Sequence, residues 1–347
     1  MKKVYIVILN YNNWADTIEC LESVLKSDYQ NYQIILVDNN SSDSSEYYLK
    51  KWLNGELCIW TNPNHKLRNL SFPPSEKPIP YIFYTRKEIE NMGKNFVEKS
   101  ESHSSYSTKY PNPIIFIQTH ENLGFAGGNN VGIKYALAKD DFEYIWLLNN
   151  DTVIEKNTLS KLIECATKKE KNYGLFGTAL LYYDAPDRIQ ALGGKFNKLF
   201  ATSKHIFAFK KYENITDIPK FDYIIGASLL MTRDFIKNVG LLSEDYFIYY
   251  EEIDLAFRAE KKGYKMFICK DSIVYHKESV TIKKQEKKSS EFSDYFRIKN
   301  RIKVTRKFNP IYLPFVYGGI TLSIVKRLKR RQYKQAFNAL KILLGMK

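Results

Sequence analysis

The sequence contains few cysteines and no motif of closely spaced ones. Cys20, Cys58, Cys165 and Cys269 lie far apart, and no two of them form a C-x-x-C pair. Structural zinc sites and disulfide-rich small folds usually show close, regular cysteine spacing, so the sequence predicts neither a zinc site nor a disulfide framework. A reducing, cytoplasmic compartment is the simplest expectation for such a chain.

The sequence also lacks a long hydrophobic run. No stretch of 18 consecutive apolar residues occurs, so an ordinary transmembrane helix is not expected. The N-terminal segment is too short for a signal peptide, because polar Asn10 ends the apolar run Val4–Leu9.

Net charge is almost absent from most of the chain. Residues 1–276 are close to neutral, whereas residues 277–347 hold 19 Lys/Arg and four Asp/Glu and therefore carry the whole net charge of +15. A nucleic-acid-binding surface would spread its basic residues over the fold. We therefore expect no nucleic-acid partner and a basic C-terminal segment with a separate role.

Short β-branched runs alternate with helical patterns along the chain. The expected strands are Val4–Leu9, Ile34–Val37, Ile114–Gln118 and Tyr144–Leu148, and the expected helices between them are Trp14–Lys26, Ser44–Leu53 and Asn129–Ala138. This alternation predicts an α/β fold with a mostly parallel sheet flanked by helices. Residues 61–113, rich in Pro, Ser, Asn and Lys, interrupt the rhythm and are expected to form an insertion or long loop. Later helices are expected at 158–167, 234–239 and 251–262, after or around a strand-like stretch from 174 to 225.

Three segments carry residues suited to chemistry. In LLNNDT, Asp151 follows a buried strand, where a carboxylate can hold Mg²⁺ or Mn²⁺ beside diphosphate oxygens. In YYEEIDLAFRAEKKGY, the acids Glu251, Glu252 and Asp254 begin an expected helix and are candidates for a general base. The third segment, NLGFAGGNNVG, lets backbone approach a ligand closely but is not the G-x-G-x-x-G dinucleotide fingerprint. Taken singly, the three are equally typical of an Asn/Asp turn, a helix cap and a glycine-rich turn.

The order of these segments along one chain is much more specific than any one of them. Together with VYIVILNYN, VDNNSSD and VYHKES, they resemble family 2 glycosyltransferases of the GT-A fold, close to the bacterial rhamnosyltransferase-like group. The resemblance covers about residues 1–60 and 114–280. It implies a Rossmann-like GT-A catalytic domain over 1–280, with 61–113 as an insertion, followed by a helical, basic tail over 281–347.

The resemblance also implies roles for individual positions. Asn10, Asn12, Asp38, Asn122, Gly124, Asn129 and Asn149 match positions that line the site of the nucleotide-sugar donor. Asp151 and His276 match the metal or diphosphate ligands. Glu252 falls where the family usually has the Asp taken as catalytic base, and Glu251 or Asp254 remains an alternative. The chain departs from the usual D-x-D motif, because the weaker ligand Asn149 replaces the first carboxylate.

The implied activity is metal-dependent, inverting transfer of a sugar to a hydroxyl group. The donor would be dTDP-rhamnose or a UDP-sugar, the cofactor Mg²⁺ or Mn²⁺, and the acceptor a lipid-linked or nascent cell-surface polysaccharide. The alternatives are a catalytically inactive membrane or nucleic-acid-binding adaptor and a GT-A nucleotidyltransferase, although NYNNWAD lacks the phosphate loop of the latter.

The C-terminal segment predicts attachment to a membrane surface. Residues 311–325 are apolar but too short to span a bilayer, and KRLKRR follows them directly. Aromatic and apolar residues beside a basic run are typical of an interfacial helix on anionic lipid. A packed C-terminal helix with a solvated basic face is the alternative. The expected location is peripheral, at the inner face of the cell membrane; the sequence does not fix the oligomeric state.

Overall fold

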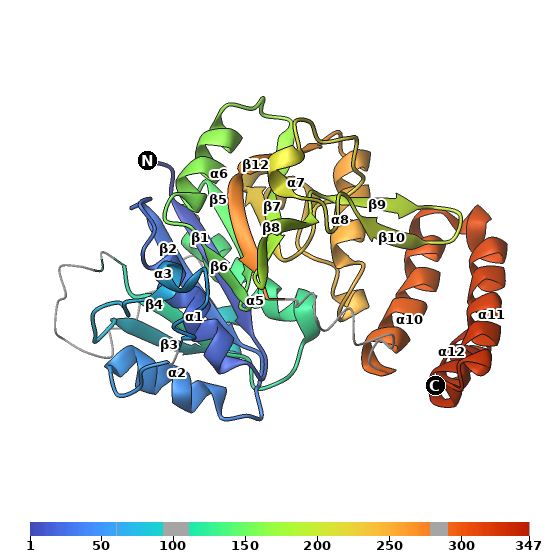
Figure 1. Ribbon diagram of the computed structural model, residues 1–347, viewed down its shortest axis with the longest axis horizontal. Coiled ribbons are helices and arrows are strands. Elements are labelled where there is room, and N and C mark those ends of the chain that lie inside the picture. Colours follow the sequence, from blue (N-terminus) through green and yellow to red (C-terminus); the bar gives the residue numbers. More distant parts are fainter. Residues whose placement is uncertain (60, 93–109, 111, 278–290, 347) are drawn as a thin grey trace.

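The protein is a mixed α/β structure built around one large sheet. The computed structural model describes residues 1–59, 61–92, 110, 112–277 and 291–346. In this part of the chain the sheet has ten strands, in the order β3-β4-β2-β1-β5-β11-β7-β12-β6, with β8 paired to β7 (Figure 1). This is the predicted α/β class with a GT-A-type sheet.

The first half of the sheet is entirely parallel. It consists of β1 (Val4–Asn10), β2 (Tyr32–Asp38), β3 (Tyr81–Thr85), β4 (Ile114–Gln118) and β5 (Tyr144–Asn149). β1 pairs with β2 on one side and with β5 on the other. Since the chain leaves β1 toward β2 and later returns to its other flank, the carboxyl ends of β1 and β5 lie at a topological switch point, where open α/β sheets bind ligands.

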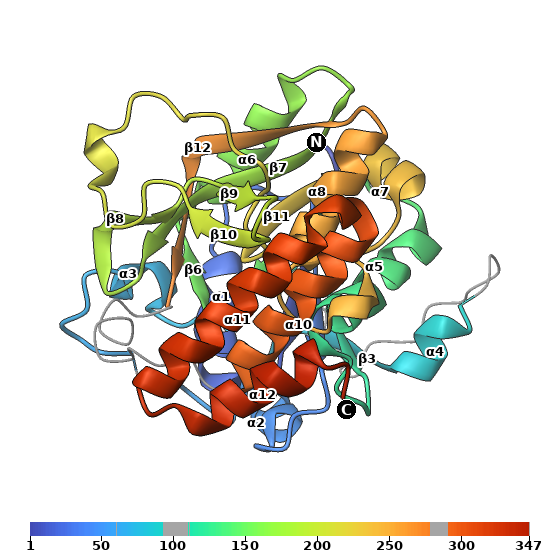
Figure 2. The same cartoon turned by 90° about the vertical axis from the view of Figure 1, so that its right-hand side faces the viewer.

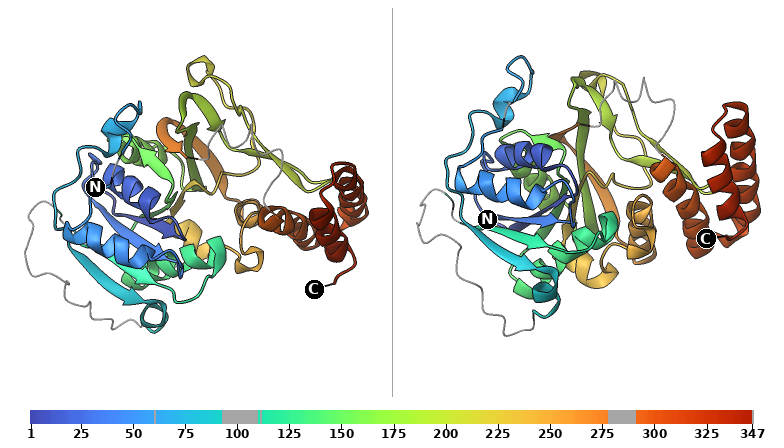
Figure 3. Two further views of the ribbon diagram at one scale, coloured as in Figure 1. Left: turned by 60° about the horizontal axis from the view of Figure 1, so that its bottom comes forward. Right: turned by 90° about the horizontal axis from the view of Figure 1, so that it is seen from below.

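The second half of the sheet is mixed. Its strands are β6 (Thr152–Ile154), β7 (Tyr173–Tyr182), β8 (Ala185–Ala191), β11 (Ser228–Thr232) and β12 (Lys265–His276). β11 is antiparallel to both β5 and β7, whereas β12 runs parallel to β7. A separate hairpin, β9 (Gly194–Asn197) with β10 (Thr202–His205), extends toward the C-terminal helices in Figures 1 and 3.

Helices cover both faces of the sheet because its side chains alternate between two cores. Val4, Ile6 and Ile8 of β1 belong to one core with helix α1, and Tyr5 and Val7 belong to the other with helix α5. The larger helices of this part are α1 (Trp14–Val24), α2 (Ser45–Asn54), α5 (Gly124–Lys139), α6 (Thr158–Thr167), α7 (Arg233–Val239) and α8 (Glu251–Lys261).

Helix α5 lies unusually close to β1 because of its glycines. A Cβ on Gly128 would lie 2.4 Å from Leu9 Cδ1 and 3.3 Å from the Asn39 side chain. The glycine-rich segment therefore serves, at this position, close packing of a helix on the sheet beside the β1 and β2 ends.

The expected insertion is more ordered than the sequence predicted. Its described residues include α3 (Arg68–Ser71), β3 and α4 (Arg86–Glu90). β3 pairs in parallel with β4 and extends the sheet by one edge strand, so this part of 61–113 is not simply a long loop. Its Tyr81-Ile82-Phe83-Tyr84 run carried a strand pattern that the surrounding Pro and Lys residues obscured. Residues 93–109 lie outside the described part.

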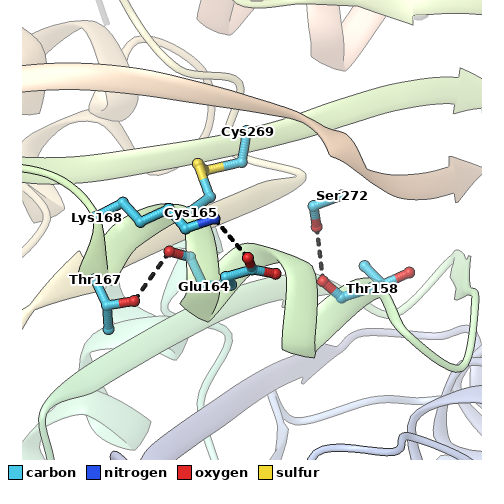
Figure 4. The surroundings of a disulfide bond; sticks show 7 residues. All are labelled: Thr158, Glu164, Cys165, Thr167, Lys168, Cys269 and Ser272. Carbon is cyan, nitrogen blue, oxygen red and sulfur yellow. Dashed lines mark hydrogen bonds and ion pairs between the residues drawn. A yellow bond between two sulfur atoms is a disulfide. The ribbon is translucent and has the colours of Figure 1, made fainter.

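Two of the four cysteines are paired, which the sequence analysis did not predict. A disulfide joins Cys165 of α6 to Cys269 of β12, with a separation of 104 residues in the sequence (Figure 4). The fold brings them together by packing α6 on β12, a contact that cysteine spacing cannot reveal. Cys20 and Cys58 are free thiols. The pairing removes the reason for expecting a reducing compartment.

The C-terminal helices stand together at one end of the molecule (Figures 1 and 2). They are α10 (Glu291–Phe308), α11 (Leu313–Lys329) and α12 (Tyr333–Leu343). Ile298, Ile302 and Val304 of α10 share a buried cluster with Tyr246 and Tyr250, so α10 packs directly on the region around α8. Of the helices in the described ranges, none is long and apolar enough to cross a membrane.

Candidate active site

A cavity of about 750 Å³ lies between the mixed half of the sheet, α8 and the C-terminal helices. Asn149, Asp151 and His276 line it at the ends of β5 and β12, and Glu251 and Glu252 line it from the start of α8. Five of the predicted site residues, far apart in the sequence, therefore face one cavity. Ligand sites are typically clefts of this size.

Asp38 and Asn10 form the centre of a buried hydrogen-bond network rather than part of this cavity wall. Both are fully buried, and Asn10 Nδ2 donates to Asp38 Oδ1 at 2.7 Å. Asp38 also accepts from the Ser41 hydroxyl at 2.5 Å and from Gln118 Nε2 at 2.8 Å. These bonds join the carboxyl ends of β1, β2 and β4, so Asp38 fixes the floor of this edge of the sheet.

The neighbouring predicted donor residues organise the loops above that floor. Asn12, exposed and with φ of +53°, accepts hydrogen bonds from the backbone N–H groups of Ser42 and Asp43. Asn122 accepts from Asn39 Nδ2 at 3.0 Å, and buried Asn129 donates to the Phe125 carbonyl at 2.9 Å. The structure thus gathers these residues at the β1–β2 edge, adjacent to the cavity through Phe125.

Gly124 occupies a position that requires glycine. Its φ is +70°, and a Cβ there would lie 2.3 Å from the Phe247 carbonyl oxygen. The next residue, Phe125, donates its backbone N–H to the same carbonyl at 2.6 Å. The glycine-rich loop is therefore tied to the segment that leads into α8, which connects the donor-side loop to Glu251 and Glu252.

Asp151, His276 and Asn149 form a row of polar side chains. His276 Nε2 lies 3.0 Å from Asp151 Oδ1 and 3.4 Å from Asn149 Nδ2, while its Nδ1 lies 2.9 Å from Gln190 Oε1. Burial acts to raise the pKa of Asp151, but the charge and hydrogen bond of His276 and the charge of Lys277 outweigh it and hold that pKa below its usual value. Asp151 is therefore an anion at neutral pH.

The donor set fits a divalent cation only in part. Within the described residues, no group of three or more His, Cys, Asp or Glu side chains is arranged to hold a metal. One carboxylate and one imidazole are present, and Gln190 sits where a metal-ligating histidine commonly has an oxygen partner for its other ring nitrogen. Such a site suits a cation that takes its remaining ligands from a bound diphosphate and water.

Glu251 is buried and the adjacent Glu252 is half-buried, and the Oε2 atom of each has no hydrogen-bond partner in the described part of the structure. Burial, followed by the charge of Glu252, raises the pKa of Glu251 well above its usual value. Burial raises the pKa of Glu252 to about 7, although backbone hydrogen bonds and the charge of Arg297 lower it. The pair therefore holds one proton readily and titrates near neutrality.

The backbone just before this pair is strained, and a side chain from helix α10 holds it by hydrogen bonds. Phe247, Tyr249 and Tyr250 all have positive φ, between 62° and 77°. Asn300 of α10 places Nδ2 2.8–3.0 Å from the carbonyl oxygens of Tyr246, Ile248 and Tyr249. The C-terminal helix thus stabilises the turn that aims the two glutamates.

Asp254, the third candidate base, is placed elsewhere. Its carboxylate is fully buried and accepts from Arg258 Nε at 2.6 Å, from Lys307 Nζ at 2.5 Å and from the Tyr246 hydroxyl at 3.0 Å. It does not line the cavity. The structure brings Asp254 into an ion-pair network between α8 and α10 instead.

Sequence reasoning missed several cavity residues. Gln190 lies within a strand that carries no motif, so nothing in the sequence linked it to His276. Arg297 and Arg301 line the cavity from α10, and Arg327 lines it from α11. The segment Tyr295–Arg301, with the sequence YFRIKNR, resembles the Y-Y-x-x-R-N segment that follows the catalytic domain in relatives, and this resemblance is the signal that could have pointed to Arg297 and Arg301.

Comparison with known families identifies the class of this fold and site. The family described as "Glycosyltransferase like family 2" matches residues 100–301, and "Glycosyl transferase family 2" matches residues 5–70. The chain belongs to glycosyltransferase family 2.

Curated relatives agree with this assignment at low identity. The low-salt glycan biosynthesis hexosyltransferase Agl10 of Haloferax volcanii is 25% identical over 54% of this chain and 59% of its own length. The rhamnosyltransferase WbbL of Escherichia coli is 28% identical over 41% of this chain and 56% of its own. The chain thus spans somewhat over half the length of these relatives.

A solved structure supports the fold. The mannosyltransferase PcManGT of Pyrobaculum calidifontis, in complex with GDP-Man and Mn²⁺, superposes with a TM-score of 0.52 at 11% identity and covers 100% of this chain and 88% of that one. The architecture described above is that of a GT-A glycosyltransferase.

Proposed function

We propose that this protein transfers a sugar from a nucleotide-diphosphate donor to an acceptor hydroxyl with inversion at the anomeric carbon. The observation that carries the proposal is the meeting in one cavity of a polar row, Asn149, Asp151 and His276, with the adjacent carboxyl groups of Glu251 and Glu252. The first group suits a diphosphate leaving group and its cation, and the second suits proton removal from a hydroxyl.

Glu252 is the proposed general base. A base works best when its pKa lies near the working pH, and the pKa of Glu252 is about 7. Burial and the neighbouring charge of Glu252 raise the pKa of Glu251 well above its usual value, so in this proposal Glu251 keeps its proton. Glu252 takes the proton of the acceptor hydroxyl, and the resulting oxygen attacks the anomeric carbon opposite the departing nucleotide, which inverts the configuration.

The donor is proposed to lie over the carboxyl ends of β1, β2 and β5. Asn12, Asn122, Gly124 and Asn129 shape the loops there, with Asp38 and Asn10 as the buried floor. Asp151 and His276 would hold Mg²⁺ or Mn²⁺, which when bound neutralises charge developing on the diphosphate. Mn²⁺ accompanies GDP-Man in the PcManGT complex, and its ligand preferences accommodate both carboxylate and imidazole.

The enzymatic proposal is tested with a panel of nucleotide sugars. We expect one donor, among them dTDP-rhamnose and UDP-sugars, to be hydrolysed slowly and transferred to a lipid-linked or oligosaccharide acceptor. NMR of the product shows the anomeric configuration. Absence of donor binding and of hydrolysis across the panel, with Mg²⁺ or Mn²⁺ present, contradicts the proposal, and a product with retained configuration contradicts the mechanism.

We further propose that α11 and α12 attach the protein to an anionic membrane surface. Large apolar side chains are exposed on these helices, namely Phe315, Leu322, Val325, Leu328, Tyr333, Phe337 and Leu340. Lys326, Lys329, Arg330 and Arg331 are exposed among them. Apolar side chains flanked by cations complement a bilayer whose headgroups are negative, whereas no described segment of the chain covers this face.

A further inference from the structure

Three arginines from the C-terminal helices line the active-site cavity. Arg297 and Arg301 lie on α10, and Arg327 lies on α11. The helices that carry them lie side by side on the face turned toward the viewer in Figure 2. They line the same cavity as Glu251 and Glu252.

The positive charge of this wall is only partly neutralised. Arg327 forms a bidentate pair with buried Asp294, at 3.1 Å and 2.5 Å. Arg301 donates Nε and Nη2 to the carbonyl of Phe200, a neutral acceptor. Arg297 lies over the ring of Tyr249, 4.8 Å from its centroid, and no carboxylate of the described residues forms an ion pair with it. Among the described residues, Asp294 is thus the one carboxylate that forms an ion pair with any of the three arginines, and it pairs with Arg327 alone.

Two of the three arginines, Arg301 and Arg327, are partly buried, whereas Arg297 is exposed. Burial lowers the pKa of Arg301, and the nearby charge of Arg327 adds to the effect, which is the result of holding like charges together. Retaining two cations side by side in a partly desolvated wall costs free energy unless an anion binds there.

The arginine wall is distinct from the end of the cavity proposed for the donor diphosphate. Asn149, Asp151 and His276 line the cavity from the ends of β5 and β12, whereas the arginines line it from α10 and α11. Arg297 acts on the pKa of Glu252, the group proposed to contact the acceptor hydroxyl. The arginines therefore come from different elements than the residues proposed to hold the diphosphate and its cation.

We propose that Arg297, Arg301 and Arg327 form a subsite for a phosphate or diphosphate group carried by the acceptor. This inference rests on the proposed glycosyl transfer and adds to it a chemical class of acceptor: a phosphate-bearing lipid. Guanidinium groups bind phosphate through paired N–H donors, and several of them together hold a doubly charged group.

The position of α11 gives the lipid part of such an acceptor a place. Arg327 lines the cavity, whereas Leu322, Val325 and Leu328 on the same helix are exposed. In this arrangement the hydrocarbon part of the acceptor stays in the membrane beside α11 and α12. Its first polar group, the phosphate, then reaches the arginines. Its sugar hydroxyl then lies farther into the cavity, toward Glu252.

The test uses the full chain and soluble probes. Decyl diphosphate and the neutral decyl β-glucoside are titrated below their aggregation concentrations, and affinities are measured by calorimetry. We expect the anionic probe to bind at least tenfold more tightly. Arg297→Gln, at an exposed position that tolerates substitution, is expected to weaken that binding roughly tenfold, as for loss of one charge-assisted hydrogen bond.

Two variants serve as controls. Lys299→Gln removes one charge from an exposed position on the same helix that does not line the cavity, and its affinity should stay within twofold of wild type. Arg297→Lys keeps the charge without the planar pair of donors, and we expect an intermediate affinity. Equal binding of the two probes, or an equal loss in Lys299→Gln and Arg297→Gln, overturns the subsite.

A competition experiment separates the acceptor from the donor as the source of the phosphate. Saturating UDP, dTDP or GDP with Mn²⁺ should leave decyl diphosphate bound; displacement would assign the arginines to the donor and overturn the proposal. If the wild type cleaves no nucleotide sugar yet binds decyl diphosphate through Arg297, the proposed enzymatic function fails while the anion subsite stands.

Discussion

Replacing each glutamate of the adjacent pair by glutamine separates their roles. Glu251→Gln mimics a carboxyl group that is already protonated, so we expect it to retain most of the transfer activity. Glu252→Gln removes the only proposed acceptor of the hydroxyl proton, and turnover should fall by about 10²-fold or more. Donor affinity should stay nearly constant in both variants, because neither side chain is proposed to contact the nucleotide.

The dependence of the transfer rate on pH provides a second quantitative test of the proposed base. A base must be ionised, so activity rises with pH through its pKa. At pH 6 a carboxyl with a pKa of about 7 is ionised in about a tenth of the molecules, whereas a carboxyl with the usual pKa of 4.5 would be ionised in about 97% of them. We therefore expect the rate at pH 6 to be about a tenth of the plateau reached above pH 8.

The same raised pKa makes the folding stability fall as pH rises, whereas it makes the activity rise. Between the unfolded value of 4.5 and about 7, the folded protein binds more protons at Glu252 than the unfolded chain does, so stability falls as pH rises. Glu252→Gln removes this loss and should raise the unfolding free energy at pH 8 by up to about 3 kcal/mol. Full stabilisation is not expected, since Glu252 is half-buried with one enclosed oxygen.

The assay follows transfer by nucleotide release between pH 5 and 9, with thermal unfolding in the same buffers. An inactive Glu251→Gln beside an active Glu252→Gln would place the base one residue earlier. A wild-type profile already flat at pH 5.5 would refute the raised pKa itself. A destabilised Glu252→Gln at pH 8 would show that the ionised carboxylate has a favourable partner.

Three further predictions concern other parts of the chain. Asp151→Ala should lower metal-stimulated transfer at least 10²-fold and abolish thermal stabilisation by Mn²⁺, with exposed Asp187→Ala as the control; full activity of folded Asp151→Ala would exclude it as a ligand. The triple change Lys329→Gln, Arg330→Gln and Arg331→Gln should weaken binding to anionic vesicles about a hundredfold in a sedimentation assay, at about 1 kcal/mol per charge. The double change Phe337→Ser with Leu340→Ser should instead remove the part of the binding that persists at high salt. Unchanged binding in both variants would argue against this surface. Gly124→Ala, which forces a Cβ to 2.3 Å from the Phe247 carbonyl at a φ of +70°, should cost about 1–3 kcal/mol and lower the unfolding temperature; an unchanged temperature would mean that the loop moves freely.

The sheet was predictable because its strands carry their own pattern. Val4–Leu9, Ile114–Gln118 and Tyr144–Leu148 are continuous apolar runs of strand length, and the observed strands match them within a residue. β3 was missed, since its short run lies between Pro-rich and Lys-rich segments that indicate a loop. The Cys165–Cys269 disulfide was missed because it depends on how α6 packs on β12, not on spacing.

The sequence predicted the site residues that lie in recognisable motifs. It could not predict which of them, or which other residues, the tertiary packing brings to the cavity. Asp151, His276, Glu251 and Glu252 meet in one cavity, but their roles as ligands and base are still predictions. Asp254 lies in the same acidic segment as the two glutamates, but its carboxylate pairs with Arg258 and Lys307 instead of facing the cavity. Gln190 and Arg327 come from segments that have no motif, so long-range packing alone places them.

The hydrogen bonds from Asn300 to the turn before α8 bear on how this protein can be divided and recombined. Because one side chain of α10 holds three carbonyl oxygens of that turn, we expect the smallest unit with correctly placed Glu251 and Glu252, the proposed catalytic pair, to extend beyond residue 280 and to include α10. A chimera that joins residues 1–280 to the tail of a relative needs an asparagine at the equivalent point. The tail and the catalytic part are therefore expected to be inherited together rather than exchanged as independent modules.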